Sequence, residues 1–306
     1  MSAVGELLEG GVRLAIPLLV ASSGELVSER AGVLNLSVEG MMLTGAFAGA
    51  VGAHQSGSAL VGVGCALAAG LLVALLQAVL SVTLRADQIV TGIAANALAL
   101  GATTYGTRLI FTQDRSVPGF DPVKIPLLHE IPFLGPALFE QTALGYVSFA
   151  LVAALAVLFG RRTGLGLAVS AIGEDAATAD RSGLPVTALR YGAVLLTGLT
   201  SALAGAHLAL SDVHAFTENL TSGAGYLAVV AVIAGRWRAW PTLFACLFFG
   251  VAQALQFAAP AFGIHLPTAV LVMSPYLLAL LAVSGLTGAS RSPSALTLPF
   301  VREARA

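Results

Sequence analysis

Long apolar runs, separated by short charged or turn-forming stretches, make up most of this chain. Each run is close to the roughly 20 residues that an α-helix needs to cross the hydrocarbon core of a membrane. The pattern predicts nine spans, at about 11–27, 33–53, 58–83, 88–110, 142–160, 188–210, 224–236, 241–259 and 266–285. The run at 224–236 is short for a full crossing, and Pro17 and Pro275 are expected to interrupt their helices. We therefore expect an all-α polytopic membrane protein with a tilted, broken or re-entrant element.

Composition supports this class and excludes others. Of the 306 residues 57% are hydrophobic and 10% are charged, whereas a soluble domain is about one quarter charged. The net charge of −1 and the lack of a basic tract give no sign of a nucleic-acid partner. The small-residue pairs Gly45/Gly49 and Gly198/Ala202 are expected to let helices approach closely. We treat residues 1–306 as one transmembrane domain.

The distribution of basic residues predicts how the chain is oriented, because short cytoplasmic loops collect Lys and Arg. If the loop 161–190 is cytoplasmic, 11 of the 15 basic residues also lie inside. These are Arg30, Arg85, Arg161, Arg162, Arg181, Arg190, Arg236, Arg238, Arg291, Arg302 and Arg305. The N-terminus is then outside, the C-terminus is cytoplasmic, and 111–141 is the main external loop. Its prolines should prevent a long helix there: Pro118, Pro122, Pro126, Pro132 and Pro136.

Motifs for enzymatic chemistry are missing from the sequence. Lys124 is the only lysine and belongs to no G-x-x-x-x-G-K-[ST] loop, so the chain cannot be its own P-loop ATPase. No metalloprotease or serine-hydrolase pattern occurs, which disfavours a membrane-embedded hydrolase. The pair Gly164 and Gly166 is interpreted as a flexible connection at the membrane edge. His207, Asp212 and His214 suggest either a metal or proton site, or ordinary interfacial polar residues.

Polar side chains within the apolar runs are candidates for a solute path. Glu39 is the carboxylate that the pattern places deep in a span, where an isolated charge costs several kcal/mol. It could contact a substrate, pair with Arg30 or cap a neighbouring half-helix. Serine and threonine could equally bond to their own helix backbone. The candidates for the path are Asn35, Ser37, Glu39, Gln88, Thr91, Asn96, Thr197 and Ser201.

A short helix is predicted within 165–185, on the cytoplasmic side. Glu174 and Asp175 favour its start through the helix dipole, and Gly183 with Pro185 ends it. Such a helix could dock on a soluble partner or could be an ordinary loop helix. The candidate docking residues are Gly173, Glu174, Asp175, Ala176, Ala177, Asp180, Arg181 and Gly183.

Three segments resemble a known family. Residues 28–43 read S-E-R-A-G-V-L-N-L-S-V-E-G-M-M-L. Residues 166–184 begin with G-L, continue with G-E at 173–174 and have a glycine at 183. Residues 221–237 contain G-A-G-Y followed by G-R. These segments resemble permease subunits of bacterial ABC importers for nucleosides and simple sugars, relatives of ribose and branched-chain amino-acid permeases. Thr178 and Leu184 depart from the usual alanine and isoleucine.

The resemblance implies a type II ABC importer fold in a bacterial cytoplasmic membrane, with 165–185 as the coupling helix. It implies a separate cytoplasmic ATPase that alone holds Mg-ATP, with no cofactor in this chain. The motif at 28–43 points to the nucleoside branch, which works beside a second, different permease. An extracellular or lipoprotein binding protein would deliver the solute. Ribose-type or branched-chain amino-acid transport stays an alternative, and so does an ion-coupled carrier, although Glu39 alone makes a poor ion site.

Overall fold

The computed structural model describes residues 3–111, 116–126, 129, 131, 134–160, 163–259, 267–286 and 292–301. Pro132 and the arginines 161, 162, 291, 302 and 305, on which predictions above depend, lie outside these residues. The helices are α1 (Ala3–Arg30), α2 (Val38–Ser56), α3 (Ala59–Ala78), α4 (Gln88–Ile110), α5 (Leu134–Phe139), α6 (Ala143–Leu158), α7 (Gly164–Glu174), α8 (Ala176–Arg181), α9 (Val186–His207), α10 (Ala224–Ala234), α11 (Ala239–Ala258) and α12 (Thr268–Leu286). Two π-helical turns, η1 (Val79–Thr83) and η2 (Leu208–Val213), extend α3 and α9, and two short strands are β1 (Pro122–Lys124) and β2 (Glu140–Thr142).

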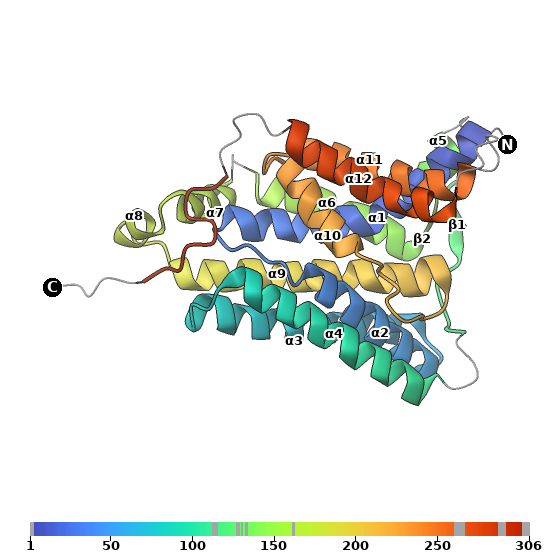
Figure 1. The fold of residues 1–306 in the computed structure, drawn as a ribbon, viewed down its shortest axis with the longest axis horizontal. Helices are drawn as coiled ribbons and strands as arrows, with labels where there is room; N and C mark the ends of the chain where they lie inside the picture. Colours follow the sequence, from blue (N-terminus) through green and yellow to red (C-terminus); the bar gives the residue numbers. More distant parts are fainter. Residues whose placement is uncertain are drawn as a thin grey trace.

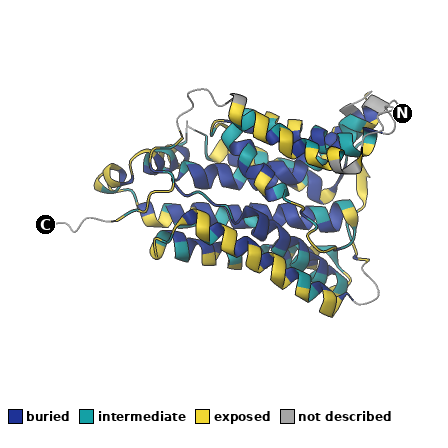
Figure 2. Cartoon of the chain, in the orientation of Figure 1, coloured by how far each residue is buried: buried dark blue, intermediate teal, exposed yellow. Residues whose placement is uncertain are grey.

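Two long helices, α1 and α9, run side by side through the centre of the bundle (Figure 1). Helices α2, α3 and α4 lie on one side of this pair, and α10, α11 and α12 lie on the other (Figure 1). Burial follows this arrangement, with buried residues concentrated on the central helices and exposed ones on the outer faces (Figure 2). The central helices therefore carry the core.

Glycine and alanine produce the close contacts between these helices. A Cβ added to Gly45 would lie 2.6 Å from Cα of Ala202, and one on Gly198 would lie 2.3 Å from Cβ of Ala74. The contacts join α2 and α3 to α9 with almost no space between the backbones. The predicted packing role of the small-residue pairs is thus confirmed, and it fits an environment in which van der Waals contact drives helix association.

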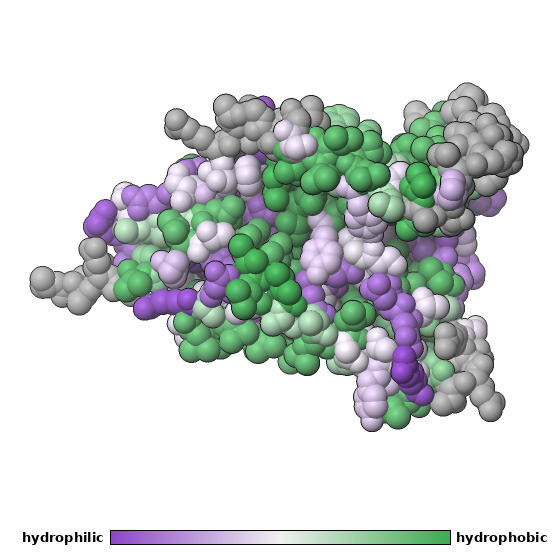
Figure 3. Space-filling model, in the orientation of Figure 1, coloured by the Kyte–Doolittle hydropathy of each residue, from purple (hydrophilic) through white to green (hydrophobic). Residues whose placement is uncertain are grey.

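Five helical segments among the described residues are long and apolar enough to cross a membrane. They are Gly5–Arg30, Ala59–Thr83, Gln88–Ile110, Val186–Val213 and Ala239–Ala258. Shorter apolar helices include α6 and α10. The polytopic class follows, whereas the count of nine spans stays a prediction. Much of the face in Figure 3 is correspondingly hydrophobic, and hydrophilic residues lie towards both ends of the bundle.

Three local predictions were wrong. Both α1 and α12 continue through their prolines, Pro17 and Pro275, which were expected to interrupt them. A proline removes one backbone hydrogen-bond donor, and packing against neighbouring helices compensates for that loss. The run at 33–53 is helical only from Val38 onwards. Gly164 and Gly166 belong to the first turn of α7 and do not form a flexible link, because the Thr163 hydroxyl caps that turn by accepting the Gly166 amide at 3.0 Å.

The two ends of the bundle differ. The N-terminus lies near α5 and the β1/β2 ladder, while α8 and the C-terminus lie at the opposite end (Figure 1). The strands pair antiparallel, with Val123 opposite Gln141. The longest helix among the described residues of 111–141 is the six-residue α5, as the prolines predicted. The relative placement of the termini agrees with the arginine pattern, but which end faces the cytoplasm stays a prediction.

Candidate functional site

Two helices begin inside the bundle instead of at its ends. Residues 31–37 lead irregularly into α2, and a loop that follows η2 leads into α10 (Figure 1). Gly223 caps α10 with φ of +87°, a backbone conformation that favours glycine. The short run at 224–236 is therefore a half-helix, which among the predicted tilted, broken or re-entrant elements is the broken one. Four backbone amides at the start of any helix lack intrahelical partners, so each of these two buried starts needs side-chain acceptors.

Glu39 supplies the acceptors for α10. Its Oε1 accepts from the Thr221 hydroxyl at 2.5 Å and from the Gly223 amide at 2.9 Å. Its Oε2 accepts from the Gly225 amide at 2.7 Å. The side chain is buried, and a negative charge at a helix N-terminus is favourable. Of the three roles considered for Glu39, the structure shows the capping of a neighbouring half-helix.

The starts of α2 and α10 touch each other at this point, which we call the half-helix junction. A Cβ added to Gly225 would lie 2.5 Å from Cα of Glu39, so only glycine fits there. Asn96 of α4 caps α2 in turn, because its Oδ1 accepts from the Gly40 amide at 2.8 Å. The Asn96 Nδ2 donates to the Leu36 carbonyl and to the Tyr226 hydroxyl, each at 2.8 Å. One side chain thus connects α4 to both half-helices.

The irregular stretch 31–37 has its backbone groups satisfied by other predicted residues. Asn35 Oδ1 accepts from the Ser37 amide at 3.1 Å and from its hydroxyl at 2.5 Å. Gln88 Oε1 accepts from the Leu34 amide at 2.8 Å. Non-helical backbone at membrane depth requires such partners. Asn35, Ser37 and Gln88 therefore hold the break in place.

The other three candidates for the path do not join this network. The Thr91 hydroxyl donates to the Asp87 carbonyl at 2.9 Å and accepts from Gln77 Nε2 at 3.2 Å. Thr197 bonds to the Ala193 carbonyl of its own helix, which is the alternative expected for a helical threonine. The Ser201 hydroxyl is buried without a hydrogen-bond partner in the part of the chain that is described.

Two buried carboxylates were missed by the sequence analysis, which took Glu39 as the deep one. Glu25 and Glu29 are both fully buried on α1. Glu25 Oε1 accepts from the Asn35 amide at 3.0 Å, and Glu29 Oε2 accepts from Trp237 Nε1 at 2.5 Å. Their i, i+4 spacing within an apolar helix was the available signal. The predicted span ended at residue 27, which placed Glu29 outside it.

The predicted cytoplasmic helix is present as a pair, α7 and α8. Asp175 is the N-cap of α8: its Oδ1 accepts from the Thr178 amide at 3.0 Å and its Oδ2 from the Thr178 hydroxyl at 2.5 Å. These bonds, the hydroxyl bond first, hold the pKa of the Asp175 carboxyl below its ordinary value. Glu174 ends α7 and does not start α8, which corrects the prediction for that residue. Gly183, with φ of +92°, follows the end of α8 as predicted.

The faces of α8 are unequal. Ala176 and Ala179 are buried against Ile172, whereas Asp175, Ala177 and Arg181 are exposed. A hollow of about 350 Å³ lies between α7 and α8, and its lining includes Leu167, Ala171, Thr178, Ser182 and Leu184. A compact helix with the carboxylates Glu174 and Asp175 before its first turn, beside an apolar hollow, suits contact with another protein.

The C-terminal segment 292–301 packs across this region. The Ala295 amide donates to the Gly173 carbonyl at 2.8 Å, and the Ser294 hydroxyl donates to Glu174 Oε2 at 3.1 Å. Arg190 of α9 donates to the Leu298 carbonyl at 2.9 Å. The segment therefore links the end of α7 to the start of α9.

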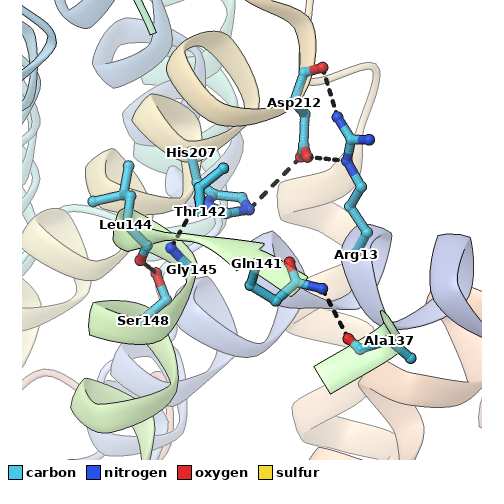
Figure 4. Close-up of polar contacts among 9 residues, drawn as sticks. All are labelled: Arg13, Ala137, Gln141, Thr142, Leu144, Gly145, Ser148, His207 and Asp212. Atoms are coloured by element: carbon cyan, nitrogen blue, oxygen red, sulfur yellow. Dashed lines mark hydrogen bonds and ion pairs between the residues drawn. The ribbon is translucent and has the colours of Figure 1, made fainter. Parts of the chain in front are cut away.

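At the opposite end of the bundle, Arg13 and Asp212 form an ion pair of 2.6 Å (Figure 4). His207 Nε2 lies 3.8 Å from Asp212 Oδ2, too far for a hydrogen bond (Figure 4). Among the described residues no group of three or more His, Cys, Asp or Glu side chains could hold a metal ion. The metal interpretation of His207, Asp212 and His214 is therefore not supported.

Half-helices that meet at membrane depth, with side chains satisfying the broken backbone, are a feature of membrane transport proteins. Comparison with known proteins agrees with this class. A family model described as "Branched-chain amino acid transport system / permease component" matches residues 7–283, and the chain belongs to that family. No solved structure matches.

Three curated relatives cover nearly the same length. The guanosine ABC transporter permease protein NupQ of Bacillus subtilis is 35% identical over 95% of both chains. A putative glucose ABC transporter permease protein of Haloferax volcanii is 37% identical over 87% of this chain and 81% of its own. The nucleoside ABC transporter permease protein NupC of Lactococcus lactis is 30% identical over 94% of this chain and 93% of its own. The chain is thus a transmembrane permease subunit, and ATP hydrolysis belongs to a separate ATPase.

Proposed function

We propose that this chain forms part of the membrane pathway of an ATP-driven nucleoside importer. The observation that carries the proposal is the half-helix junction, which places polar groups inside an apolar bundle. The names of two full-length relatives, a guanosine and a nucleoside permease, support the substrate. A glucose-type sugar is the second candidate, supported by the relative that is 37% identical.

The solute path is proposed to run beside the half-helix junction. Glu39 has both carboxylate oxygens engaged by the start of α10, so its role there is to hold that helix in position. Asn35, Ser37 and Gln88 shape the wall by fixing the irregular stretch. Asn96 does the same by connecting α4 to both half-helices. Thr91, Thr197 and Ser201 are proposed to contribute hydroxyl groups. Weak contacts of this kind let a polar solute pass without being trapped.

Helix α8 is proposed to receive motion from the ATPase, which would bind Mg-ATP. Its N-cap, Asp175, and the neighbouring Glu174 are exposed, and α8 lies at the end of the molecule where the C-terminus also lies (Figure 1). That end would face the cytoplasm of a bacterial cell, with the N-terminus outside. A second, different permease would complete the pathway, and an external or lipoprotein binding protein would deliver the solute.

The test is uptake into proteoliposomes that contain the whole complex, without any ion gradient. We expect concentrative guanosine uptake that requires ATP, and we expect guanosine to be preferred over glucose. Uptake that ignores ATP but follows a sodium or proton gradient would refute the proposal. Preference for glucose would assign the second candidate.

A variant tests the coupling role. Replacing Glu174 and Asp175 together with lysine should leave membrane insertion intact and separate ATP hydrolysis from uptake, because lysine reverses the charge of the docking surface. The matched control is Asp121→Lys, an exposed carboxylate outside the α7–α8 region. Normal coupled uptake in the double variant would contradict the assignment of α8.

A further inference from the structure

Two tyrosine rings lie at the start of α10, beside the half-helix junction. Tyr226 is in the first turn of α10 and is 41% exposed, and Tyr276 of α12 is 39% exposed. The hydroxyl of Tyr226 accepts from Asn96 Nδ2 at 2.8 Å. The hydroxyl of Tyr276 donates to the Ser222 carbonyl. Both rings are thus held by their hydroxyl ends while part of each ring surface stays uncovered.

Both tyrosines are attached to the start of α10. A Cβ added to Gly223, the residue that caps α10, would lie 3.1 Å from the Tyr276 hydroxyl oxygen. Tyr226 follows Gly223 by three residues, so its side chain leaves the same turn of backbone. The start of α10 therefore carries one tyrosine in its own first turn, and a second tyrosine, from α12, bonds to the loop just before it.

The depth of this pair is unusual for tyrosine. Tyrosines exposed on membrane proteins concentrate at the interface, where the hydroxyl reaches water. Here Asn96 sits near the middle of α4, and α10 starts inside the bundle (Figure 1). Both hydroxyls bond to protein groups, Asn96 and the Ser222 carbonyl. Two anchored rings with uncovered surfaces beside a polar junction are the arrangement expected of a binding surface for a flat solute.

We propose that Tyr226 and Tyr276 form an aromatic subsite that contacts the base of the transported nucleoside. This inference rests on the proposed function and names the part of the solute that is recognised. Stacking on an aromatic ring suits purines and pyrimidines alike, because every base has a π-face. Ser222 and Asn219 are exposed on the adjoining loop and offer polar partners of the kind that a ribose uses.

The junction is poorly suited to an amino acid. A zwitterion needs an acceptor for its ammonium group, and the carboxylate present, Glu39, already accepts from Thr221, Gly223 and Gly225. A carboxylate has about four acceptor positions, so three donors leave Glu39 about one for the three N–H groups of an ammonium. An uncharged aromatic solute makes no such demand.

The experiment compares ring removal with ring retention in the complete reconstituted complex. Tyr226→Leu and Tyr276→Leu should each lower the rate of ATP-driven guanosine uptake by about five- to a hundredfold, the range expected for loss of a base–aromatic contact. Tyr226→Phe and Tyr276→Phe keep the ring and should recover most of that loss. Tyr105→Leu, an exposed tyrosine farther along α4, is the matched control and should leave uptake unchanged.

Assembly and basal ATP hydrolysis are measured for every variant, so that a folding defect is recognised. Leucine variants that assemble and transport guanosine like the wild type would overturn the subsite while leaving the proposed function intact. Phenylalanine variants as impaired as the leucine variants would also overturn it, because the hydroxyl anchor and not the ring would then matter. Absence of ATP-dependent guanosine uptake in the wild-type complex would instead overturn the proposed function.

Discussion

Replacing Glu39 with glutamine tests the role of the half-helix junction most directly. The substitution keeps the shape of the side chain and removes its charge. Both carboxylate oxygens face a backbone amide, Oε1 that of Gly223 and Oε2 that of Gly225. A glutamine side chain has only one oxygen, so either orientation of its amide places an NH₂ group against an N–H donor.

The expected cost follows from these contacts. Losing one hydrogen bond to a charged acceptor costs about 1.5–3 kcal/mol. Removing a negative charge from a partly buried helix N-terminus adds up to about 2 kcal/mol. Because the two effects overlap, we expect Glu39→Gln to lower the free energy of unfolding by about 2–4 kcal/mol. Uptake should also fall, since α10 would no longer be held at the junction.

Denaturant unfolding in detergent micelles and uptake by the reconstituted complex measure the two effects. Glu218→Gln is the matched control, because Glu218 pairs with Arg108 on the surface at 3.0 Å. An exposed ion pair contributes less than about 1 kcal/mol. If Glu39→Gln matches the wild type in both measurements, the carboxylate does not hold α10 and the reasoning is refuted.

Two further changes probe the site. Gly225→Ala would place a Cβ 2.5 Å from the Glu39 Cα and should lower the free energy of unfolding by about 1–3 kcal/mol. The control is Gly192→Ala, where nothing lies within 4 Å of the added Cβ, and it should not destabilise the protein. Equal stability of the two variants would contradict the close approach of Gly225 to Glu39. The pKa of Asp175 is lowered on folding, so its contribution to stability is present above the ordinary value of 3.8 and is lost as the pH falls through the lower folded pKa. An NMR titration of Asp175 should show the lowered pKa, and Thr178→Val should raise the pKa of Asp175. An ordinary Asp175 pKa in the wild type would count against its role as the N-cap of α8.

Much of the architecture could be predicted from the sequence because it depends on local interactions. The apolar runs are long enough to demand helices in a membrane, and this requirement does not depend on which helices become neighbours. The start and stop signals of α8 act within a few residues, through the Asp175 cap and Gly183. The shortness of the run at 224–236 likewise indicated a tilted, broken or re-entrant element before any contact was known, and the helix there is the short α10.

Only the tertiary structure decided what the polar residues inside the bundle do. Glu39 bonds to residues 182 to 186 positions away, so its partner could not be inferred from neighbouring positions. Glu25 and Glu29 are buried because α1 packs against later helices, and Glu29 is included because α1 continues to Arg30, beyond the predicted span. Prolines that break an isolated helix are tolerated here, since contacts with other helices stabilise the continuous backbone. Hydropathy determines that a segment enters the membrane, whereas the arrangement of helices determines which polar groups meet there.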